Sequence, residues 1–335
     1  MYIEKPEDLE RVLLGYDIVL SDIYGVLWDG KSEIEGAVAT LSFLRTRGKR
    51  VVLISNISSR SDGLENGYFS GTGLRRGYSY DLMVTSGDLM LDTLGNGSRL
   101  FSTDRPLKKC YVLGKLKLEN FARKAGYELV GSPEEADFVY VGFPQLSLEE
   151  VERLDASSRD SVFESDMYGE RYFDVTDPEI FSERLARCRR RNLPMLSDSA
   201  DLVAPQADRK TGKLNYVLRQ GTLAKNYREI GGEVVEICKP SSTIYAYALR
   251  KLESLLGQGA VDLKKSKIIM VGDTLDTDIL GANNATRDLA LEIDTMLTLC
   301  GVSGKLLGRN PEALLDFCGA KKLSLDYMVN SLALS

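Results

Sequence analysis

Residues 16–30 read YDIVLSDIYGVLWDG, and this stretch carries the pattern that decides the fold. The apolar run 16–21 predicts a buried strand that ends at the carboxylate of Asp22, and Gly25 then permits a tight turn. In open α/β sheets, ligands bind at the carboxyl ends of the strands. Asp22 is therefore either a residue that carries chemistry or a residue of the turn that ends the strand, and both interpretations fit this stretch equally well.

A helix and a second strand follow. Apolar side chains recur at helical spacing over residues 34–48, and residues 49–56 (KRVVLISN) form a second apolar run that ends in Ser55 and Asn56. The order strand, helix, strand predicts two parallel strands joined by a right-handed crossover. Asp22 and Ser55 would then lie at the same edge of the sheet, where a serine hydroxyl that faces an acid is a candidate donor to a phosphate.

The strand pattern returns late in the chain. Residues 267–272 (KIIMVG) are followed directly by Asp273, and Asp276 and Asp278 lie in the same turn before another predicted helix. Acids this close repel one another unless a cation or solvent relieves the repulsion, and a hard divalent metal shared with Asp22 would explain the cluster. The alternative is an acidic helix N-terminus, favoured by the helix dipole, which explains Asp276 and Asp278 better than Asp273.

Lys239 lies where one predicted α/β series ends and the next begins. Pro240 and two serines follow it and mark the start of an amphipathic helix, so Lys239 lies beside the positive end of a helix dipole. A separate α/β series precedes it, beginning near residue 98. We predict within that series strands at 110–114, 138–142 and 194–197, and helices at 147–156 and 177–191.

Two domains follow from this pattern. Residues 1–97 plus 238–335 would form one α/β domain with a parallel sheet, and residues 98–237 would form an α/β domain inserted into it. A chain of 335 residues is long enough for both.

Composition excludes several classes of function. The chain has no histidine, so imidazole bases and histidine metal ligands are absent, and a net charge of −6 argues against a general nucleic-acid binder. Its five cysteines are widely spaced without a C-x-x-C pair, which is typical of reduced, cytosolic proteins. No segment has a signal-type core or the ~20 apolar residues needed to span a bilayer, so we expect a cytoplasmic protein without a membrane partner.

Four separated pieces of the chain resemble the four motifs of the haloacid dehalogenase (HAD) superfamily. They are Asp22 with Gly25, Ser55, Lys239, and Asp273 with Asp278. Three segments are similar in sequence to class IIA of this superfamily, the NagD-like phosphatases. They are VTSG (84–87), GDTLDTDILGANNA (272–285) and CGVSG (300–304). The resemblance implies a Rossmann-like core, with the insert forming an α/β cap domain.

The resemblance also implies roles for these residues. Asp22 would be the nucleophile that attacks the phosphorus of a small phosphorylated metabolite and forms an aspartyl-phosphate. Ser55, Asn56 and Lys239 would bind the phosphoryl group. Mg²⁺ would be held by four groups: Asp22, Asp273, Asp278 (directly or through water) and the main-chain carbonyl of Tyr24.

Tyr24 departs from the family pattern, in which active phosphatases carry at this position a second aspartate that protonates the leaving group. Losing a general acid costs roughly 10²–10⁴-fold in rate, and least for good leaving groups such as aryl or acyl phosphates. Asp29, in the same turn, is a candidate replacement acid. The departure places Tyr24 among the site residues to be tested.

Two alternatives to a phosphatase stay open. One is a weak or inactive HAD-like protein that binds a phosphorylated ligand. The other, ranked lower, is a metal-free 2-haloacid dehalogenase, which D-x-Y-G also resembles but which has no use for the acids near Asp273. Residues 197–205 (SDSADLVAP) are the candidate substrate contacts of the cap, and the oligomeric state is open, with a homodimer as one option.

Overall fold

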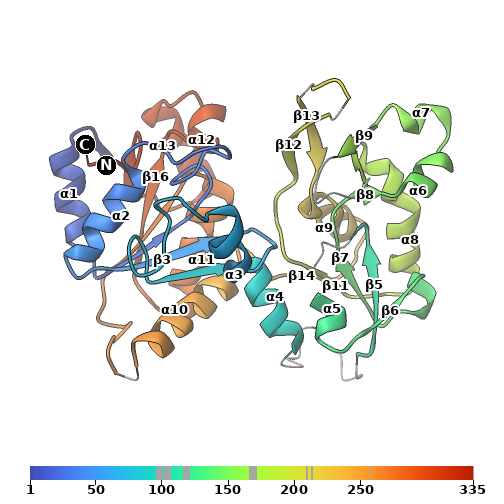
Figure 1. The fold of residues 1–335 in the computed structure, drawn as a ribbon, viewed down its shortest axis with the longest axis horizontal. Helices are drawn as coiled ribbons and strands as arrows, with labels where there is room; N and C mark the ends of the chain where they lie inside the picture. The colour runs from blue at the N-terminus through green and yellow to red at the C-terminus, as the bar shows by residue number, and fades with distance from the viewer. Residues whose placement is uncertain are drawn as a thin grey trace. The chain divides into compact units, whose positions relative to one another are not determined.

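A computed structural model describes residues 1–95, 101, 107–115, 121–165, 172–208, 210–212, 214–257 and 259–334 (Figure 1). The chain divides into two units, Met1–Leu89 with Cys238–Ser335, and Met90–Ile237. The expected boundary at residues 97 and 98 lies outside the described residues. The assignment of the units as a core and a cap stays a prediction.

A seven-stranded sheet forms the centre of the first unit, and every neighbouring pair of its strands is parallel. The strands predicted around 16–21, 49–56 and 267–272 lie at its middle and are almost entirely buried, because a parallel sheet is covered on both faces. The expected α/β class is confirmed. In their order across the sheet the strands are β1 (Tyr2–Ile3), β17 (Tyr327–Val329), β16 (Ile293–Thr298), β15 (Ile268–Gly272), β2 (Ile18–Ser21), β3 (Arg50–Ser55) and β4 (Leu82–Thr85).

The strand order reverses its direction at the centre of this sheet. From β2 the chain adds β3 and β4 on one side, and from β15 it adds β16 and β17 on the other. Where the order reverses, the connections on the two sides leave on opposite faces, and a crevice opens outside the carboxyl ends of the strands. Asp22 and Asp273 directly follow β2 and β15, so the fold places both at this point.

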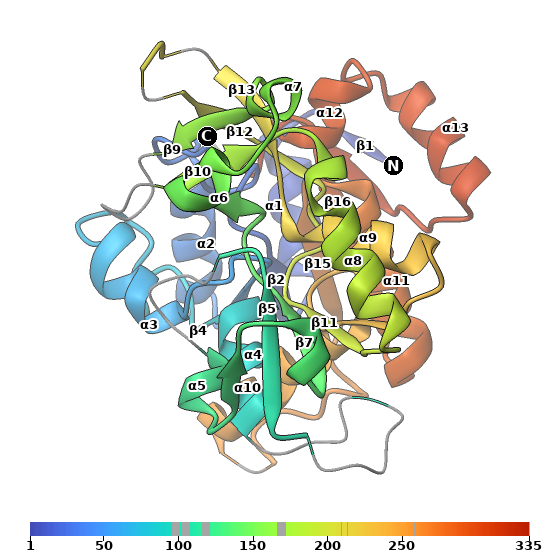
Figure 2. The same cartoon turned by 90° about the vertical axis from the view of Figure 1, so that its right-hand side faces the viewer.

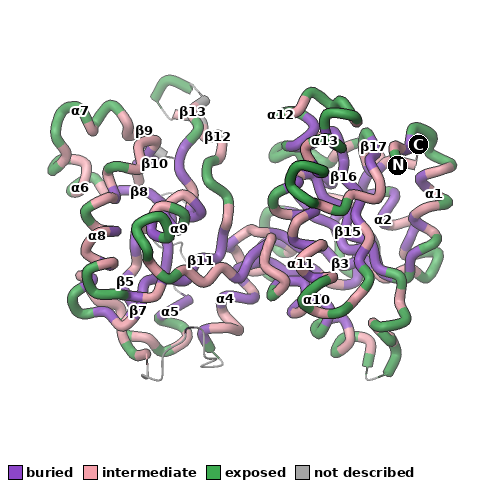
Figure 3. Tube along the Cα trace, turned by 180° about the vertical axis from the view of Figure 1, so that it is seen from behind, coloured by how far each residue is buried: buried purple, intermediate pink, exposed green. Residues whose placement is uncertain are grey.

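Helices cover both faces of the sheet. Helix α2 (Ala37–Thr46) connects β2 to β3, and α11 (Leu280–Leu289) connects β15 to β16. Right-handed crossovers that run in opposite directions lie on opposite faces, so α2 and α11 cover different faces. Helix α1 (Pro6–Leu14) shares an apolar cluster with α2, and α10 (Ser242–Leu256) contacts α11. Figure 3 shows the strands between them as the buried layer.

The remaining helical segments of the first unit differ in type and length. The turn after Asp273, expected to open a helix, begins as the π-helical segment η5 (Leu275–Ile279) before α11 starts. π-Helical segments are rare and are frequent at functional sites. The others are α3 (Ser61–Gly63), η1 (Leu64–Tyr68), α4 (Ser86–Gly95, which extends into the second unit), α12 (Val302–Leu306) and α13 (Pro311–Lys321).

The second unit has its own parallel sheet of five strands. Helices α8 (Ser182–Arg190) and α9 (Gln220–Glu229) contact each other, and α9 also contacts β11 and β7 (Figure 2). In order, the strands are β14 (Val234–Glu236), β11 (Met195–Ser197), β7 (Phe138–Val141), β5 (Lys109–Leu113) and β6 (Glu128–Val130).

Short antiparallel strands complete this unit. They are β8 (Gln145–Leu146), β10 (Tyr172–Val175) and β9 (Val162–Ser165) in one sheet, and β12 (Val203–Ala207) with β13 (Leu214–Leu218) in another.

Two of the helices predicted for the second unit are broken into pieces. The helix expected at 147–156 is instead α6 (Leu148–Glu152) and α7 (Ala156–Arg159), because the Asp155 side chain accepts from the Ser158 N–H and starts a new helix. The helix expected at 177–191 is a 3₁₀ turn, η4 (Pro178–Phe181), followed by α8. The other short segments are η2 (Pro133–Glu135) and α5 (Phe121–Lys124). Within the described ranges, no helix combines the length and apolar character needed to cross a membrane.

Candidate active site

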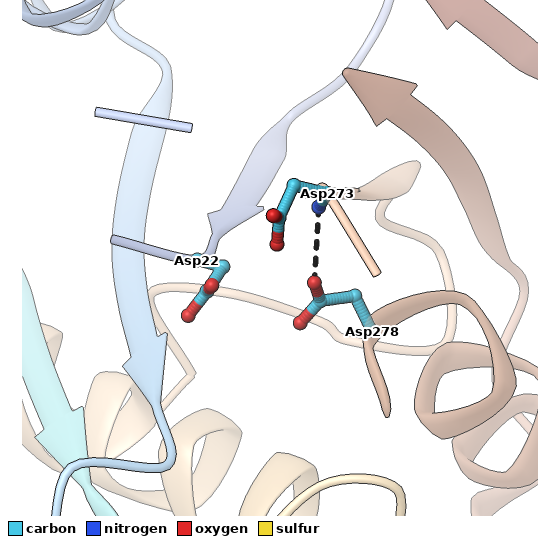
Figure 4. A group of neighbouring side chains, drawn as sticks. All are labelled: Asp22, Asp273 and Asp278. Atoms are coloured by element: carbon cyan, nitrogen blue, oxygen red, sulfur yellow. Dashed lines mark hydrogen bonds between the residues drawn. The ribbon is translucent and has the colours of Figure 1, made fainter. Parts of the chain in front are cut away.

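Three carboxylates meet at the carboxyl edge of the first unit's sheet (Figure 4). Asp22 follows β2, Asp273 follows β15, and Asp278 lies in η5. One oxygen from each carboxylate lies within 4.8 Å of the others. All three residues are buried, with Asp278 only 1% exposed. The predicted convergence of acids remote in sequence is therefore present, and Asp278 is more than part of an exposed acidic helix end.

Lys239 completes the cluster from the segment before α10. Its ammonium donates to Asp22 Oδ1 at 2.7 Å, to Asp278 Oδ1 at 2.6 Å and to the main-chain oxygen of Ile54 at 3.0 Å. The side chain is 2% exposed, so these bonds replace its hydration. These bonds join Lys239, at the start of the C-terminal part of this unit, to the ends of β2 and β3.

The cluster carries more negative than positive charge. Three ionised carboxylates and one ammonium leave two negative charges uncompensated in a buried site. Burial and the neighbouring acids raise the pKa of Asp22 and Asp273 above the usual range of a carboxyl. Burial opposes the charge of Lys239, yet Asp22 and Asp278 raise its pKa overall. Oxygen donors with this excess charge match a hard divalent cation.

Main-chain N–H groups fix how the acids point. Asp278 Oδ2 accepts from the N–H of Asp273 at 3.0 Å and of Thr274 at 3.1 Å. Asp273 Oδ2 accepts from the N–H of Val302 at 2.6 Å, and its Oδ1 accepts from the Thr274 hydroxyl at 3.0 Å. These bonds hold the carboxylates close together despite their repulsion. The roles of Thr274 and Val302 were not predicted, although Val302 lies within the segment CGVSG.

Three glycines make room for the acids. A Cβ on Gly25, whose φ is +81°, would lie 2.1 Å from Asp273 Oδ2, and a Cβ on Gly301 would lie 2.2 Å from the same atom. A Cβ on Gly272 would lie 2.1 Å from the Cβ of Asp278. No side chain fits at these distances. The sequence analysis assigned Gly25 to a turn and gave no role to Gly272 and Gly301, although all three stand in motifs that it quoted.

Ser55 and Asn56 lie at the end of β3, next to β2. The pairing of Ser21 with Leu53 places Ser55 at the same edge of the sheet as Asp22. The Ser55 hydroxyl makes no hydrogen bond to any residue that the structure describes. Asn56, in contrast, has its side chain hydrogen-bonded to the main chain of Lys239. Its Oδ1 accepts from the Lys239 N–H at 2.8 Å, and its Nδ2 donates to the main-chain oxygen of Lys239 at 3.0 Å. Its predicted contact with substrate stays a prediction.

Tyr24 differs from its neighbours in exposure. It is 37% exposed, whereas Asp22 is 8% exposed. The turn that carries it is closed by a hydrogen bond from the Gly25 N–H to the oxygen of Trp28, at 2.8 Å. Tyr24 is therefore placed by a rigid turn directly after Asp22, and its role stays a prediction.

Asp29 is poorly suited to replace the missing acid. Its Oδ1 accepts from the N–H groups of Ser32 at 2.7 Å and Lys31 at 2.8 Å. These bonds lower the pKa of its carboxyl, whereas a general acid near neutral pH needs a raised one. The structure gives Asp29 the role of closing its own turn.

Some of the residues of the second unit that we expect to contact substrate are buried, and others are exposed. Asp198, within the segment 197–205, is fully buried, and its Oδ2 accepts from the hydroxyl of Tyr140 at 3.0 Å. Leu202 and Val203 in the same segment are exposed. The expected substrate contacts of this segment stay a prediction.

Comparison with known proteins identifies relatives of both parts of the first unit. The sequence model of the family described as haloacid dehalogenase-like hydrolases matches residues 19–128, and a second, described as HAD-hydrolase-like, matches residues 236–318. Together they cover more than half of the chain. The first ends at Glu128, the first residue of β6, and the second begins just before Lys239.

Curated relatives and solved structures extend the similarity over nearly the whole length. The chain is 26% identical to phosphoglycolate phosphatase 1A of Arabidopsis thaliana, covering 93% of this chain and 76% of the relative. It is 28% identical to the glycerol-3-phosphate phosphatase of Homo sapiens, covering 98% and 92%. A haloacid dehalogenase-like hydrolase of Brucella suis is 26% identical, covers 90% of each chain and has a TM-score of 0.62. NagD of E. coli, at 21% identity, 95% and 97% coverage and a TM-score of 0.58, shares the fold.

Proposed function

The chain belongs to the haloacid dehalogenase-like hydrolases, and we propose that it is a magnesium-dependent phosphatase that hydrolyses a small phosphorylated metabolite through a phosphorylated Asp22. The observation that carries the proposal is the buried cluster of Asp22, Asp273, Asp278 and Lys239 at the point where the strand order reverses. The similarity to phosphatases over nearly the whole chain supports it.

The donor set fits Mg²⁺, which prefers carboxylate and carbonyl oxygens and keeps several waters. Asp22, Asp273 and the main-chain carbonyl of Tyr24 would hold the ion, with Asp278 bound directly or through water. A charge of +2 balances the excess charge of the cluster. When bound, the ion would offset the negative charge of the phosphoryl oxygens.

Asp22 would act as the nucleophile. Its carboxylate oxygen forms a bond to phosphorus while the bond from phosphorus to the substrate oxygen breaks, and the leaving alcohol takes up a proton. Water then attacks the aspartyl-phosphate, which releases inorganic phosphate and restores the carboxylate. Lys239 holds Asp22 in place, and its charge opposes the negative charge on the transferred group. The Ser55 hydroxyl, without a partner among the described residues, would donate to a phosphoryl oxygen.

Tyr24 shapes the range of substrates. A tyrosine at this position does not supply the carboxyl that protonates the leaving group, so we expect turnover to favour esters whose leaving group departs without help. Aryl and acyl phosphates belong to this class. The same residue favours a second candidate, a protein that binds a phosphorylated ligand without turning it over. The dehalogenase is disfavoured, because it has no use for Asp273 and Asp278.

The test is a panel of phosphate monoesters, including 4-nitrophenyl phosphate, phosphoglycolate and glycerol 3-phosphate, assayed with Mg²⁺ and with a chelator. We expect Mg²⁺-dependent turnover that Asp22→Asn and Asp273→Asn abolish. Asp276→Asn is the matched control, because Asp276 lies in the same turn but its side chain is 62% exposed and outside the cluster. Turnover that survives Asp22→Asn would contradict the proposal, and tight vanadate binding without turnover of any ester would favour the ligand-binding candidate. The cytoplasmic location and the homodimer stay predictions of the sequence.

A further inference from the structure

A cavity of about 440 Å³ lies in the first unit, away from the carboxylate cluster. It opens between the last turn of α1 and the residues where β15, β16 and β17 begin. All strands of this sheet are parallel, so their starts lie at the edge opposite to Asp22 and Asp273. The polar residues that line it are Arg11, Tyr16, Lys267, Glu292, Asp294 and Tyr327. The cavity is thus separate from the candidate active site.

A tyrosine and a carboxylate in the lining of the cavity are hydrogen-bonded to each other. The hydroxyl of Tyr16 donates to Asp294 Oδ2 at 2.6 Å and lies 3.4 Å from the hydroxyl of Tyr327. Burial, together with the bond to Asp294, raises the pKa of Tyr16, so this phenol keeps its proton and remains a donor. Asp294 Oδ1 has no hydrogen-bond partner among the described residues. One carboxylate oxygen is therefore fixed in place while the other is available to a ligand.

Charged side chains of both signs line the same cavity as this carboxylate. Lys267 and Glu292 form no ion pair within the described part of the chain. Arg11 is 78% exposed and contacts Asp8 at 3.2 Å, and a surface pair of this kind contributes little energy and is easily exchanged. The lining thus offers two cations and two carboxylates. A ligand that carries one charge of each sign complements all of them, whereas a simple anion or cation meets repulsion from half of the lining.

The position of Lys267 is set by the sheet. Its N–H donates to Asp17 Oδ2 at 2.9 Å, and its main-chain oxygen accepts from the N–H groups of Asp17 at 2.9 Å and Ile18 at 3.2 Å. Asp294 lies within β16, where it pairs with Ile269. Among the charged groups of the lining, the carboxylate of Asp294 is carried by a strand and held by Tyr16, so it loses little conformational entropy when a ligand binds. The volume is within the range typical of small-molecule sites.

We infer that this cavity binds a small zwitterion of the amino-acid class, with its ammonium group against Asp294 and Glu292 and its carboxylate against Lys267 and Arg11. The inference is independent of the proposed phosphatase activity. It assigns the chain a second ligand site, at the edge of the sheet opposite to Asp22 and Asp273.

Isothermal titration calorimetry of the full chain with each free amino acid tests this site, with the N-acetyl and amide derivatives of any amino acid that binds. We expect one saturable site for at least one amino acid, and weaker binding for both derivatives, because each lacks one of the two charges. Asp294→Asn keeps an acceptor for Tyr16 but removes the charge, and we expect it to weaken binding about tenfold or more, as for a lost charge-assisted hydrogen bond. Lys267→Gln is expected to do the same.

Exposed residues of the same type outside the lining provide matched controls. Lys264→Gln and Asp316→Asn are expected to leave the affinity unchanged. Glu292→Gln, at an exposed position where folding is not at risk, is expected to weaken binding as well. Binding by no amino acid would overturn the inference. Equal affinity in Asp294→Asn, Lys267→Gln and Glu292→Gln would overturn it too, as would undiminished binding of the derivatives.

Discussion

Gly25 and Gly30 both have positive φ angles, +81° and +99°, but their surroundings differ. A Cβ on Gly30 would meet nothing within 4 Å, whereas a Cβ on Gly25 would overlap Asp273 Oδ2. We expect Gly30→Ala to cost about 1–2 kcal/mol of stability through backbone strain alone. Gly25→Ala carries the same strain and must also displace Asp273. We therefore expect it to weaken Mg²⁺ binding by about 10–100-fold, as when the support of a metal ligand is lost.

Titration of both variants with Mg²⁺ by calorimetry, beside their thermal unfolding, checks this expectation. Equal metal affinity in Gly25→Ala and Gly30→Ala would show that the close approach of Gly25 to Asp273 has no bearing on the site.

Tyr24 tests the leaving-group argument. Tyr24→Asp supplies a carboxyl at the position where the family pattern has its acid. We expect it to raise kcat for an alkyl ester such as glycerol 3-phosphate by up to about 10²–10⁴-fold, and to change little with 4-nitrophenyl phosphate, whose leaving group needs no proton. Tyr24→Phe, which lacks an acid, serves as the control and is expected to resemble the native chain. Slower turnover of both esters by Tyr24→Asp would instead mean that the tyrosine contributes in its own right.

Asn56 joins two elements, the end of β3 and the segment that leads into α10. Its amide makes two hydrogen bonds to the main chain of Lys239, so it positions the lysine that holds Asp22. We expect Asn56→Ala to lower the free energy of unfolding by about 1–3 kcal/mol, the cost of leaving such groups unpaired. We also expect Asn56→Ala to lower phosphatase activity, chiefly through a lower kcat.

Urea unfolding and steady-state kinetics of Asn56→Ala measure both effects. Asn66→Ala is the control, because Asn66 is exposed and its side chain, among the described residues, hydrogen-bonds only to the main-chain oxygen of Asp62. A change in Asn56→Ala no larger than in Asn66→Ala would refute the positioning role.

The elements that sequence predicted correctly are those whose pattern is local. Apolar runs that end in an acid located β2 and β15, and their register then brought Asp22 and Asp273 together. Strand β8, which was missed in the second unit, has two residues and is too short to show any periodicity. The helix expected at 147–156 failed because Asp155 starts a second helix inside it.

Contacts between segments remote in sequence were beyond prediction for a different reason. The approach of Gly301 to Asp273 and the bond from the Val302 N–H to the same carboxylate depend on where α12 begins in space. The spacing of residues along the chain carries no information about that distance. The motif CGVSG was recognisable, but its function as support for an acid was not.

At the scale of the whole molecule, the buried acids couple folding to pH and to metal. Burial raises the pKa of Asp22 and Asp273 above the value near 4 of an unfolded chain. As pH rises above that value, the folded state keeps protons that the unfolded state has lost, so the free energy of unfolding falls. The raised pKa of Lys239 affects stability only at more alkaline pH. A divalent cation binds the ionised carboxylates, so it should restore more stability at higher pH.

Calorimetric melting with Mg²⁺ and with a chelator, at about pH 5.5 and about pH 8, measures this linkage. We expect the rise in Tm caused by Mg²⁺ to be larger at the higher pH, in the native chain and in Asp276→Asn alike. In Asp273→Asn the rise should largely disappear. A rise that is independent of pH, or that persists in Asp273→Asn, would place the metal elsewhere.

Detection of the phosphorylated enzyme shows whether Asp22 is the nucleophile. The protein is mixed with 4-nitrophenyl phosphate and Mg²⁺, quenched in acid during turnover, digested and examined by peptide mass spectrometry. The account predicts a phosphoryl group on Asp22 that is absent without Mg²⁺ and absent in Asp22→Asn. A phosphoryl group on another residue, or steady turnover with none on Asp22, would contradict it.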